Sequence, residues 1–366
     1  MDKYLVRTSP SLAPARRNHG AHGTKPTVVE LYAGAGGMAL GLEAAGFEHV
    51  ALIERDRQAV HTLRNNGFGK RVLCADAQSV DYSRWQGVDL VAGGPPCQPF
   101  STAGLDRGAD DPRDGWPTAA RAVAEIRPRA FVLENVAGML RDKFASYFDT
   151  VLERFWNLGY VVHVHCVDAA DYGVPQHRKR IFMVGFREIH WFPKPPPVAK
   201  HVTVGDVFAS LGPPNGQNGH SVHRVVPRRA ADGTTDAMRD ASAKRVAEGC
   251  SAPRAYGTHT GSTLDKPAKA LTAGCSGASG GCNMVRLKDG TLRYFTPREQ
   301  ARLQGFPDSY KVHAVWSYAT RQMGNACPVP LAEVFGRGVL AILNKGPHQG
   351  RPGNRVDGDD SDLAED

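Results

Sequence analysis

The sequence predicts an α/β protein with a doubly wound, mixed but mostly parallel sheet and a smaller loop-rich domain inserted late in the chain. Two observations predict this class. Between residues 27 and 186, short β-rich apolar runs alternate with amphipathic stretches, which is typical of parallel strands joined by helical crossovers. After Arg187 the alternation stops at a proline-rich segment, 191–197, and returns only near residue 295.

The expected elements follow from apolar periodicity and from turn residues. Strands are expected at 27–32, 50–54, 72–76, 89–92, 130–134, 161–167 and 180–186, and helices at 38–45, 116–126, 144–156, 297–304 and 328–343. Gly46 ends the pattern of the first helix. Thr296 and Glu299 form a capping-box pattern at the start of the fourth helix. We expect the last helix to pack back on the first domain, which makes that domain discontinuous.

Charge is distributed unevenly along the 366 residues, whose formal net charge is +8. Residues 355–366 contain six acids and one arginine, whereas 187–270 contain twelve Lys or Arg and seven Asp or Glu. Both ends of the chain, 1–26 and 344–366, are typical of flexible, solvated segments. The basic inserted region favours an anionic partner, although a variable basic surface domain would have the same composition.

Composition excludes several other classes of protein. The chain is too long for a disulfide-stapled miniprotein, and we expect no segment to reach the ~20 apolar residues of a membrane span. The first thirty residues have no apolar signal core, so we expect a cytoplasmic protein. Seven cysteines without CxxC pairs fit free thiols in a reducing compartment, and they predict no metal site.

Glycines and acids follow the first three expected strands. Gly34, Gly36 and Gly37 lie in the turn after the first strand, where glycine lets backbone approach a ligand closely. Glu54 ends the second strand and could accept both hydroxyls of a ribose, while Asp76 ends the third and could accept from an adenine amino group. Together these positions indicate a nucleoside pocket. Each acid taken singly could instead be a structural cap.

A cysteine in a rigid loop follows the fourth expected strand. Pro95 and Pro96 precede Cys97 and Pro99 follows it, so the thiol lies where the chain cannot be helical. Most cysteines are buried and inert, but a thiol in a loop beside a nucleoside pocket is a candidate nucleophile. Glu134 ends the next strand, and its carboxylate should face the same crevice.

A basic run, 176–180, precedes the strand at 180–186. Period-two alternation places Gln176, Arg178 and Arg180 on one side and turns Lys179 outward.

In the order and spacing of these motifs, the chain resembles the DNA cytosine-5 methyltransferase family, of the prokaryotic modification methylase type, from residue 27 to 343. The segments that carry the resemblance are 31–37, 95–98, 134–136, 176–180, 296–307 and 324–326. It implies the Rossmann-like fold of S-adenosylmethionine-dependent methyltransferases. It also implies a cofactor and catalytic domain at 27–186, a target-recognition domain at 187–295 and a return to the catalytic domain at 296–343.

The resemblance also implies how the reaction proceeds. Cytosine C5 is a poor nucleophile, so Cys97 attacks C6 and turns the ring into an enamine that can take a methyl group. Glu134, as a carboxylic acid held neutral by its site, protonates N3. Arg178 holds the cytosine O2, with Arg180 and Gln176 supporting the loop. The base that removes the proton from C5 is not named by the sequence.

The implied methyl donor is S-adenosyl-L-methionine, which becomes S-adenosyl-L-homocysteine, and no metal is implied. Its expected contacts are Tyr32, Ala33, Gly34, Gly36, Gly37, Glu54, Asp76, Pro95 and Asn325. Tyr32 should lie near the adenosyl part, and Asn325 should close the site. Cys327 is atypical for the closing segment, and we expect it to be buried rather than reactive.

The implied partner is double-stranded DNA, from which the cytosine is flipped out of the stack, and the enzyme is expected to act as a monomer. Candidate DNA contacts in the inserted region are Arg224, Arg228, Arg229, Arg239, Arg245 and Arg254. By analogy, the enzyme could be paired with a restriction endonuclease.

Three alternatives remain open. A transfer RNA cytosine-5 methyltransferase of the same fold would share the nucleophile loop and the acid. A non-catalytic DNA-binding protein could keep the fold as a scaffold. A nucleotide-dependent oxidoreductase shares the nucleoside pocket, but no hydride-handling residues support it.

Overall fold

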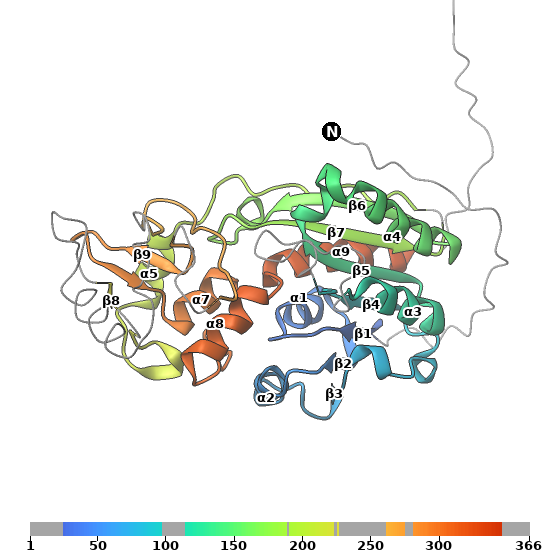
Figure 1. Cartoon of the computed structure of the whole chain (residues 1–366), viewed down its shortest axis with the longest axis horizontal. Helices are drawn as coiled ribbons and strands as arrows, with labels where there is room; N and C mark the ends of the chain where they lie inside the picture. Colours follow the sequence, from blue (N-terminus) through green and yellow to red (C-terminus); the bar gives the residue numbers. More distant parts are fainter. Residues whose placement is uncertain are drawn as a thin grey trace, which may run out of the picture.

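The computed structural model describes residues 25–96, 114–188, 190–222, 225–226, 261–274 and 281–345. The described residues form a large lobe around a seven-stranded sheet and a small lobe around a three-stranded sheet (Figure 1). The predicted flexible ends, 1–26 and 344–366, lie outside the described residues except for two positions each.

The large sheet confirms the predicted fold class. Its strands are β1 (Thr27–Leu31), β2 (Glu48–Glu54), β3 (Val72–Cys74), β4 (Leu90–Gly93), β5 (Ala130–Val136), β6 (Val161–Asp168) and β7 (Lys179–Phe186). The order is β3-β2-β1-β4-β5-β7-β6; the first five strands in the chain run parallel, and β7 is antiparallel to both β5 and β6. Each predicted strand is present, with its ends within two residues of the prediction.

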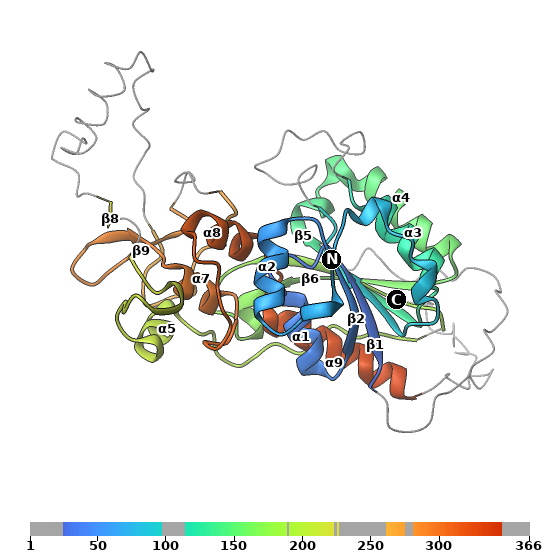
Figure 2. The same ribbon diagram turned by 90° about the horizontal axis from the view of Figure 1, so that it is seen from below.

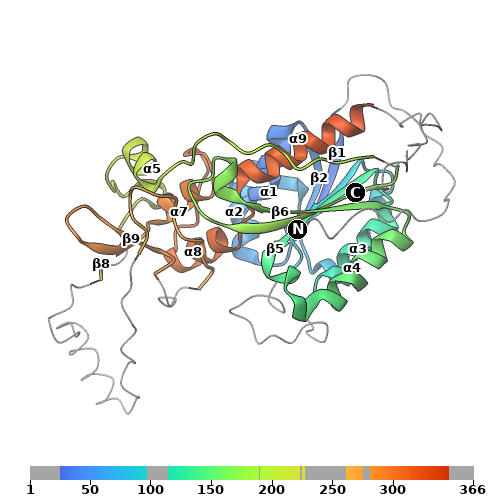
Figure 3. The ribbon, with the colours of Figure 1, turned by 90° about the horizontal axis from the view of Figure 1, so that it is seen from above.

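Helices cover both faces of this sheet. They are α1 (Gly37–Ala45), α2 (Arg57–Asn65), α3 (Trp116–Ile126), α4 (Ala145–Asn157) and α9 (Val329–Lys345). Figure 3 shows α1 and α9 on one face and α3 and α4 on the other. Successive strand residues point to opposite faces, so Val29 and Leu31 pack with α3 and α4 while Val28 packs with α1 and α9. Helix α2 was not predicted.

Short 3-10 helices join several of these elements. They are η1 (Gly69–Arg71), η2 (Ala77–Ser79), η3 (Ser83–Trp85), η5 (Ala137–Leu140), η6 (Asp142–Phe144), η7 (Ala169–Tyr172) and, in the small lobe, η8 (Gln217–Gly219).

The small lobe contains α5 (Val204–Leu211) and three short strands, β8 (Val225–Val226), β9 (Met284–Arg286) and β10 (Leu292–Tyr294). The strands pair antiparallel in the order β8-β10-β9. None of these elements was predicted, because each is too short to show a clear period. Figure 2 shows this lobe beside the large one, with α7 (Pro297–Leu303) and α8 (Trp316–Asn325) next to it.

Helix α7 begins with the predicted capping box. The Thr296 hydroxyl accepts from Glu299 N at 3.1 Å, and the Glu299 carboxylate accepts from Thr296 N at 2.8 Å. The same carboxylate forms a buried bidentate pair with Arg293 of β10. The helix contributes Ala301 to the large-lobe core and Leu303 to the small-lobe core, so it connects the two lobes.

The last helix, α9, packs along α1 and over the sheet. Phe335 of α9 stacks on Phe182 of β7, with ring centroids 4.1 Å apart and nearly parallel planes. Two glycines allow α1 and α9 to approach closely: a Cβ on Gly41 would lie 2.5 Å from Ala332 Cβ, and one on Gly336 would lie 2.9 Å from Ala45 Cβ. The final helix, which the sequence places back on the first domain, contacts α1 and the sheet of the large lobe.

The stretch Trp316–Lys345 is long and apolar enough to cross a membrane by length and composition alone, which the sequence analysis did not expect. It consists of two helices, α8 and α9, with Ala326, Cys327 and Pro328 between them. Of its most apolar window, 56% is buried inside the protein. Its apolar character is therefore used in the core.

Replacing Gly41 by valine should destabilise the protein. The added side chain meets Ala332 and the Val329 carbonyl, and overpacking of this kind costs about 1–3 kcal/mol. The free energy of unfolding from a denaturant titration measures this loss. Ala44→Val, on the exposed side of the same helix, is the control and should change stability by about 0.5 kcal/mol or less. Equal stability of the two variants would contradict the close packing of α1 on α9.

Candidate active site

The predicted site residues next to the parallel strands lie along one edge of the large sheet. The glycine turn follows β1, Glu54 ends β2, Asp76 follows β3, and the Pro95 loop follows β4. Because β7 is antiparallel to β5, Arg180 at its start pairs with Val136 at the end of β5. The strand order reverses between β1 and β4, and ligands of such sheets bind outside the carboxyl ends at this point.

The turn after β1 is built from residues in the left-handed backbone region. Tyr32, Gly34 and Gly36 have φ of 56°, 53° and 81°. Gly37, which opens α1, lies so close to the segment after α8 that a Cβ there would be 2.1 Å from Cys327 O. Ala33 N donates to Ile53 O at 3.1 Å, which ties the turn to β2. A side chain at Gly36 or Gly37 would therefore displace this turn.

The two acids after β2 and β3 both have structural bonds. Glu54 accepts from Gly34 N at 2.8 Å and from Asp56 N at 2.7 Å. Asp76 caps η2 by accepting from Gln78 N at 3.0 Å, and its side chain is 43% exposed. Since a carboxylate has about four acceptor positions, each acid keeps capacity for a ligand. The structural role that the sequence left open for each acid is therefore present. The bonds that fulfil it also orient the two carboxylates.

Tyr32 follows β1 and Asn325 ends α8, so these two predicted contacts come from distant parts of the chain. The Tyr32 hydroxyl donates to Gly115 O at 3.4 Å, and burial raises its pKa to about 12. Asn325 is the last residue of α8, and it is exposed. Both are available to a ligand that reaches from the β1 turn to the end of α8.

The Pro95 loop is fixed next to Glu134. Asn135 Nδ2 donates to Pro95 O at 3.1 Å, and the Asn135 side chain is buried. A Cβ on Gly94 would lie 3.4 Å from Glu134 Oε2, so the loop backbone passes directly beside that carboxylate. The predicted nucleophile, Cys97, lies outside the described residues and follows Pro96 in the chain.

Glu134 forms an ion pair with Arg180. Their Oε1 and Nε atoms are 2.8 Å apart, and the two side chains are 10% and 13% exposed. The carboxyl group of Glu134 and the planar guanidinium of Arg180 are close enough to bond neighbouring atoms on the same edge of a planar ligand.

The period-two pattern predicts that Gln176 and Arg178 lie on the same side as Arg180, and this prediction is wrong. Strand β7 begins only at Lys179, so the alternation does not extend back to these two residues. Arg178 is 2% exposed and donates to Leu271 O at 2.9 Å, Gly324 O at 2.7 Å and Ala326 O at 3.2 Å. Its guanidinium therefore points to the segments that flank Asn325 and not to Glu134. Lys179 is exposed, as predicted.

Gln176 lies in the same buried contact between the lobes, which we call the junction. Its amide nitrogen donates to Leu303 O at 2.9 Å, and its amide oxygen accepts from Leu271 N at 2.8 Å. Gln304, which the sequence analysis did not single out, donates to Met323 O at 2.5 Å and to Ala326 O at 3.3 Å. The sequence signal for Gln304 is its place in the 296–307 segment, which carries the family resemblance but assigns no role to Gln304.

Cys327 is buried, as predicted, and burial raises the pKa of its thiol. Among the described residues, no group of three or more His, Cys, Asp or Glu side chains could hold a metal ion. The predicted DNA contacts, Arg224, Arg228, Arg229, Arg239, Arg245 and Arg254, lie outside the described residues.

Comparisons with known proteins give one family. The family model of C-5 cytosine-specific DNA methylases matches residues 26–340. The Type II methyltransferase M.NgoMIV of Neisseria gonorrhoeae is 36% identical over 324 residues, which are 87% of this chain and 98% of that protein. The Type II methyltransferase M.PspPI of Psychrobacter sp. is 34% identical over 339 residues, which are 88% of this chain and 80% of that protein.

Solved structures share the fold. A structure described as a DNA modification methyltransferase encoded within an E. coli prophage is 23% identical, with a TM-score of 0.62 over 87% of this chain and 99% of its own. The S. pombe Dnmt2 methyltransferase is 21% identical, with a TM-score of 0.60 over 87% of this chain and 100% of its own. The family resemblance of the motifs is thus confirmed: this chain belongs to the C-5 cytosine-specific DNA methylases and is a DNA methyltransferase.

Proposed function

We propose that this enzyme transfers a methyl group to C5 of a cytosine flipped out of double-stranded DNA, through a covalent adduct between Cys97 and C6. The observation that carries the proposal is the Glu134–Arg180 pair, 2.8 Å apart and beside the backbone of the loop that leads to Cys97. Attack of the thiolate on C6 places negative charge on the ring. Protonation at N3 by Glu134, which must enter this step as the carboxylic acid and leaves it as the carboxylate, removes that charge and drives the addition.

We assign the contact with cytosine O2 to Arg180 in place of Arg178. N3 and O2 are adjacent on the ring, so an acid and a guanidinium that already touch each other can meet both atoms at once. Arg178 donates to three backbone carbonyls in the junction and is almost fully buried. We therefore give Gln176 and Arg178 a positioning role.

The residues at the sheet edge fit S-adenosylmethionine as the methyl donor, whose sulfonium carries the methyl group that is transferred. Glu54 would accept from the ribose, and Asp76 would accept from the adenine amine. The turn of Tyr32, Ala33, Gly34, Gly36 and Gly37 would enclose the cofactor, with Pro95 and Asn325 completing the site. The left-handed backbone at Gly34 and Gly36 and the acceptor capacity left on Glu54 support this assignment.

The inserted region, 187–295, is proposed to read the target sequence, with its arginines on phosphates or bases. By analogy with its Type II methyltransferase relatives, we propose that the enzyme works in the cytoplasm and is paired with a restriction endonuclease. We propose that one protomer acts alone on its site.

Covalent trapping tests the proposal. DNA that contains 5-fluorocytosine should give a denaturant-resistant adduct with the wild type, because fluorine at C5 blocks the elimination that releases the cysteine. Cys97→Ser should give none, and Glu134→Gln should bind DNA but form the adduct about 10²–10⁴-fold more slowly.

The matched control is Cys166→Ser, an exposed thiol on β6, which should trap like the wild type. An adduct with Cys97→Ser would refute the assignment of the nucleophile. Trapping on RNA alone would give the function to the RNA-modifying alternative.

The variants Arg180→Lys and Arg178→Lys distinguish the roles proposed for the two arginines. Lysine cannot provide the planar fork of arginine at either position. Its loss should affect catalysis where the arginine contacts the substrate, and stability where the arginine holds the backbone. Arg180→Lys should lower kcat by about 10²-fold or more with little change in Tm. Arg178→Lys should lower Tm, because one ammonium cannot satisfy three buried carbonyls in their present positions. Steady-state kinetics and thermal unfolding measure both; a reversed pattern would return the O2 contact to Arg178.

Binding of DNA should weaken steeply with salt if the basic region contacts phosphates. The slope of log K against log salt concentration is about −0.9 for each phosphate neutralised. Fluorescence anisotropy from low to high salt measures the slope. Replacing one phosphate-contacting arginine, for example by Arg228→Ala, should reduce it by about one, and a flat response in the wild type would exclude this region as the DNA clamp.

A further inference from the structure

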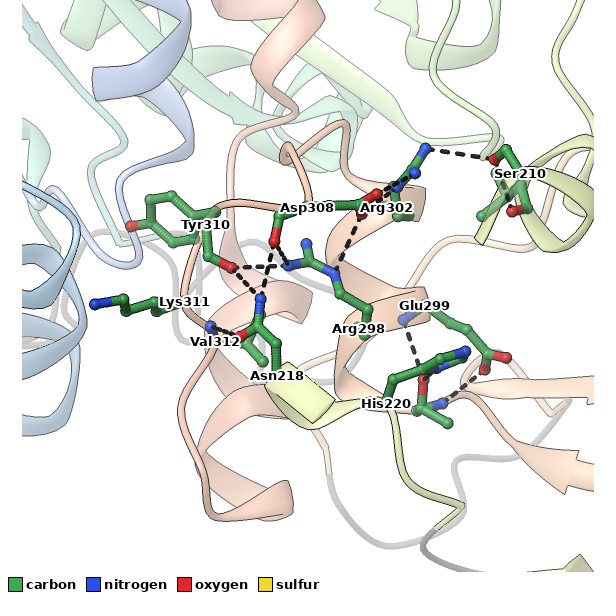
Figure 4. Close-up of polar contacts among 12 residues, drawn as sticks. Ser210, Asn218, His220, Arg298, Glu299, Arg302, Asp308, Tyr310, Lys311 and Val312 are labelled. Atoms are coloured by element: carbon green, nitrogen blue, oxygen red, sulfur yellow. Dashed lines mark hydrogen bonds and ion pairs between the residues drawn. The ribbon is translucent and has the colours of Figure 1, made fainter. Parts of the chain in front are cut away.

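The segment between α7 and α8, residues 305–315, touches both lobes, and we call it the connector. On the large-lobe side, Asn66 at the end of α2 forms reciprocal bonds with Lys311: Lys311 N donates to Asn66 Oδ1 at 2.7 Å, and Asn66 Nδ2 donates to Lys311 O at 2.9 Å. On the small-lobe side, Asn218 of η8 holds the connector, as Figure 4 shows. Residues 308–315 of the connector lie outside the motifs, and the proposed chemistry assigns the connector no role.

Tyr310 of the connector reaches into the glycine turn. Its hydroxyl donates to Ala35 O at 2.5 Å, and the side chain is 3% exposed. Its ring lies 4.9 Å from that of Phe306, in the core that also contains Ala33 and Ala35. Burial raises the pKa of Tyr310, so the phenol remains a donor over the whole working range of pH.

This bond fixes one peptide group of the turn. Ala35 C=O and Gly36 N–H belong to the same planar unit, so they point in opposite directions. With the carbonyl on Tyr310, Gly36 N donates to Ala33 O at 2.9 Å, which closes the turn. Gly36 has φ of 81°, and a Cβ there would lie 3.0 Å from the Tyr310 hydroxyl. Glycine can adopt other conformations easily, so a turn of this kind depends on such a partner to hold one.

The backbone of Tyr310 is held by the small lobe. Its carbonyl accepts from Arg298 of α7 at 2.7 Å and from Asn218 Nδ2 at 3.0 Å. Asn218 Oδ1 in turn accepts from Val312 N at 3.2 Å. Arg302 of α7 pairs with Asp308 through both oxygens of its carboxylate (Figure 4). The residue that supports the turn is therefore positioned by α7 and η8.

We propose that Tyr310 is a positioning residue for the cofactor turn, and that the connector links this turn to the small lobe through Asn218. The inference rests on the proposed binding of S-adenosylmethionine at the turn. Tyr310 touches no reacting atom in this role. It holds the Ala35–Gly36 peptide in the orientation that the cofactor meets.

The test is Tyr310→Phe, with Tyr160→Phe as the matched control. Tyr160 is also 3% exposed and also donates its hydroxyl to a backbone carbonyl, Pro128 O, at 2.7 Å, but it lies away from the turn. Both variants lose one buried hydrogen bond and should lose similar stability in thermal unfolding. Only Tyr310→Phe should weaken the binding of S-adenosylmethionine. Its Kd and KM should rise about five-fold, while kcat should change less than about two-fold.

Isothermal titration with S-adenosylmethionine and steady-state kinetics give these values. An unchanged Kd in Tyr310→Phe, or an equal rise in Tyr160→Phe, would overturn the positioning role. A wild type that binds no S-adenosylmethionine would overturn the proposed cofactor and this inference together, so the two failures are distinguishable.

The link to the small lobe is tested with Asn218→Gly. Asn218 has φ of 41°, which glycine adopts without strain, so this variant removes the side chain and keeps the backbone. It should raise the Kd for S-adenosylmethionine two- to five-fold. In combination with Tyr310→Phe the effects should be less than additive, because both act through the same residue. Full additivity, or no effect of Asn218→Gly, would overturn the link.

Discussion

A buried guanidinium at the meeting point of the two lobes determines how this protein is assembled. Arg178 is 2% exposed, and a buried charge is tolerated only where its hydrogen bonds are made. Its donors bond Leu271 O from the small lobe and Gly324 O and Ala326 O from the end of α8. These segments can come together in few other arrangements without leaving the charge unsatisfied.

The geometry of the site depends on that junction. Arg180, two residues further along the chain, starts β7 in the register that brings it to Glu134. Asn325 lies between the two α8 carbonyls that Arg178 holds, so its position at the sheet edge is determined by the same side chain. A residue to which we assign no contact with substrate thus helps to orient two proposed parts of the site, which is the preorganisation that electrostatic catalysis requires.

The sequence predicted what depends on local pattern. Strand and helix periods, the capping box of Thr296 and the glycines after β1 are properties of neighbouring residues, and they gave the large sheet and the turn. Partners distant in sequence could not be found in this way. Arg178 and Arg180 share one motif and the same alternation, yet the first bonds residues 93 to 148 positions away and the second bonds Glu134. Tyr310, 275 positions from Ala35, had no sequence signal at all.

The packing of α9 has a consequence for how the protein is made in the cell. The apolar sides of α1 and β7 are completed by residues such as Phe335 and Val339, which are synthesised after both of these elements. Until these residues emerge from the ribosome, Leu42 and Phe182 lack the helix that covers them in the folded protein. The nascent chain therefore exposes apolar surface that chaperones can bind. The large lobe therefore completes its core only after α9 has been synthesised and has docked.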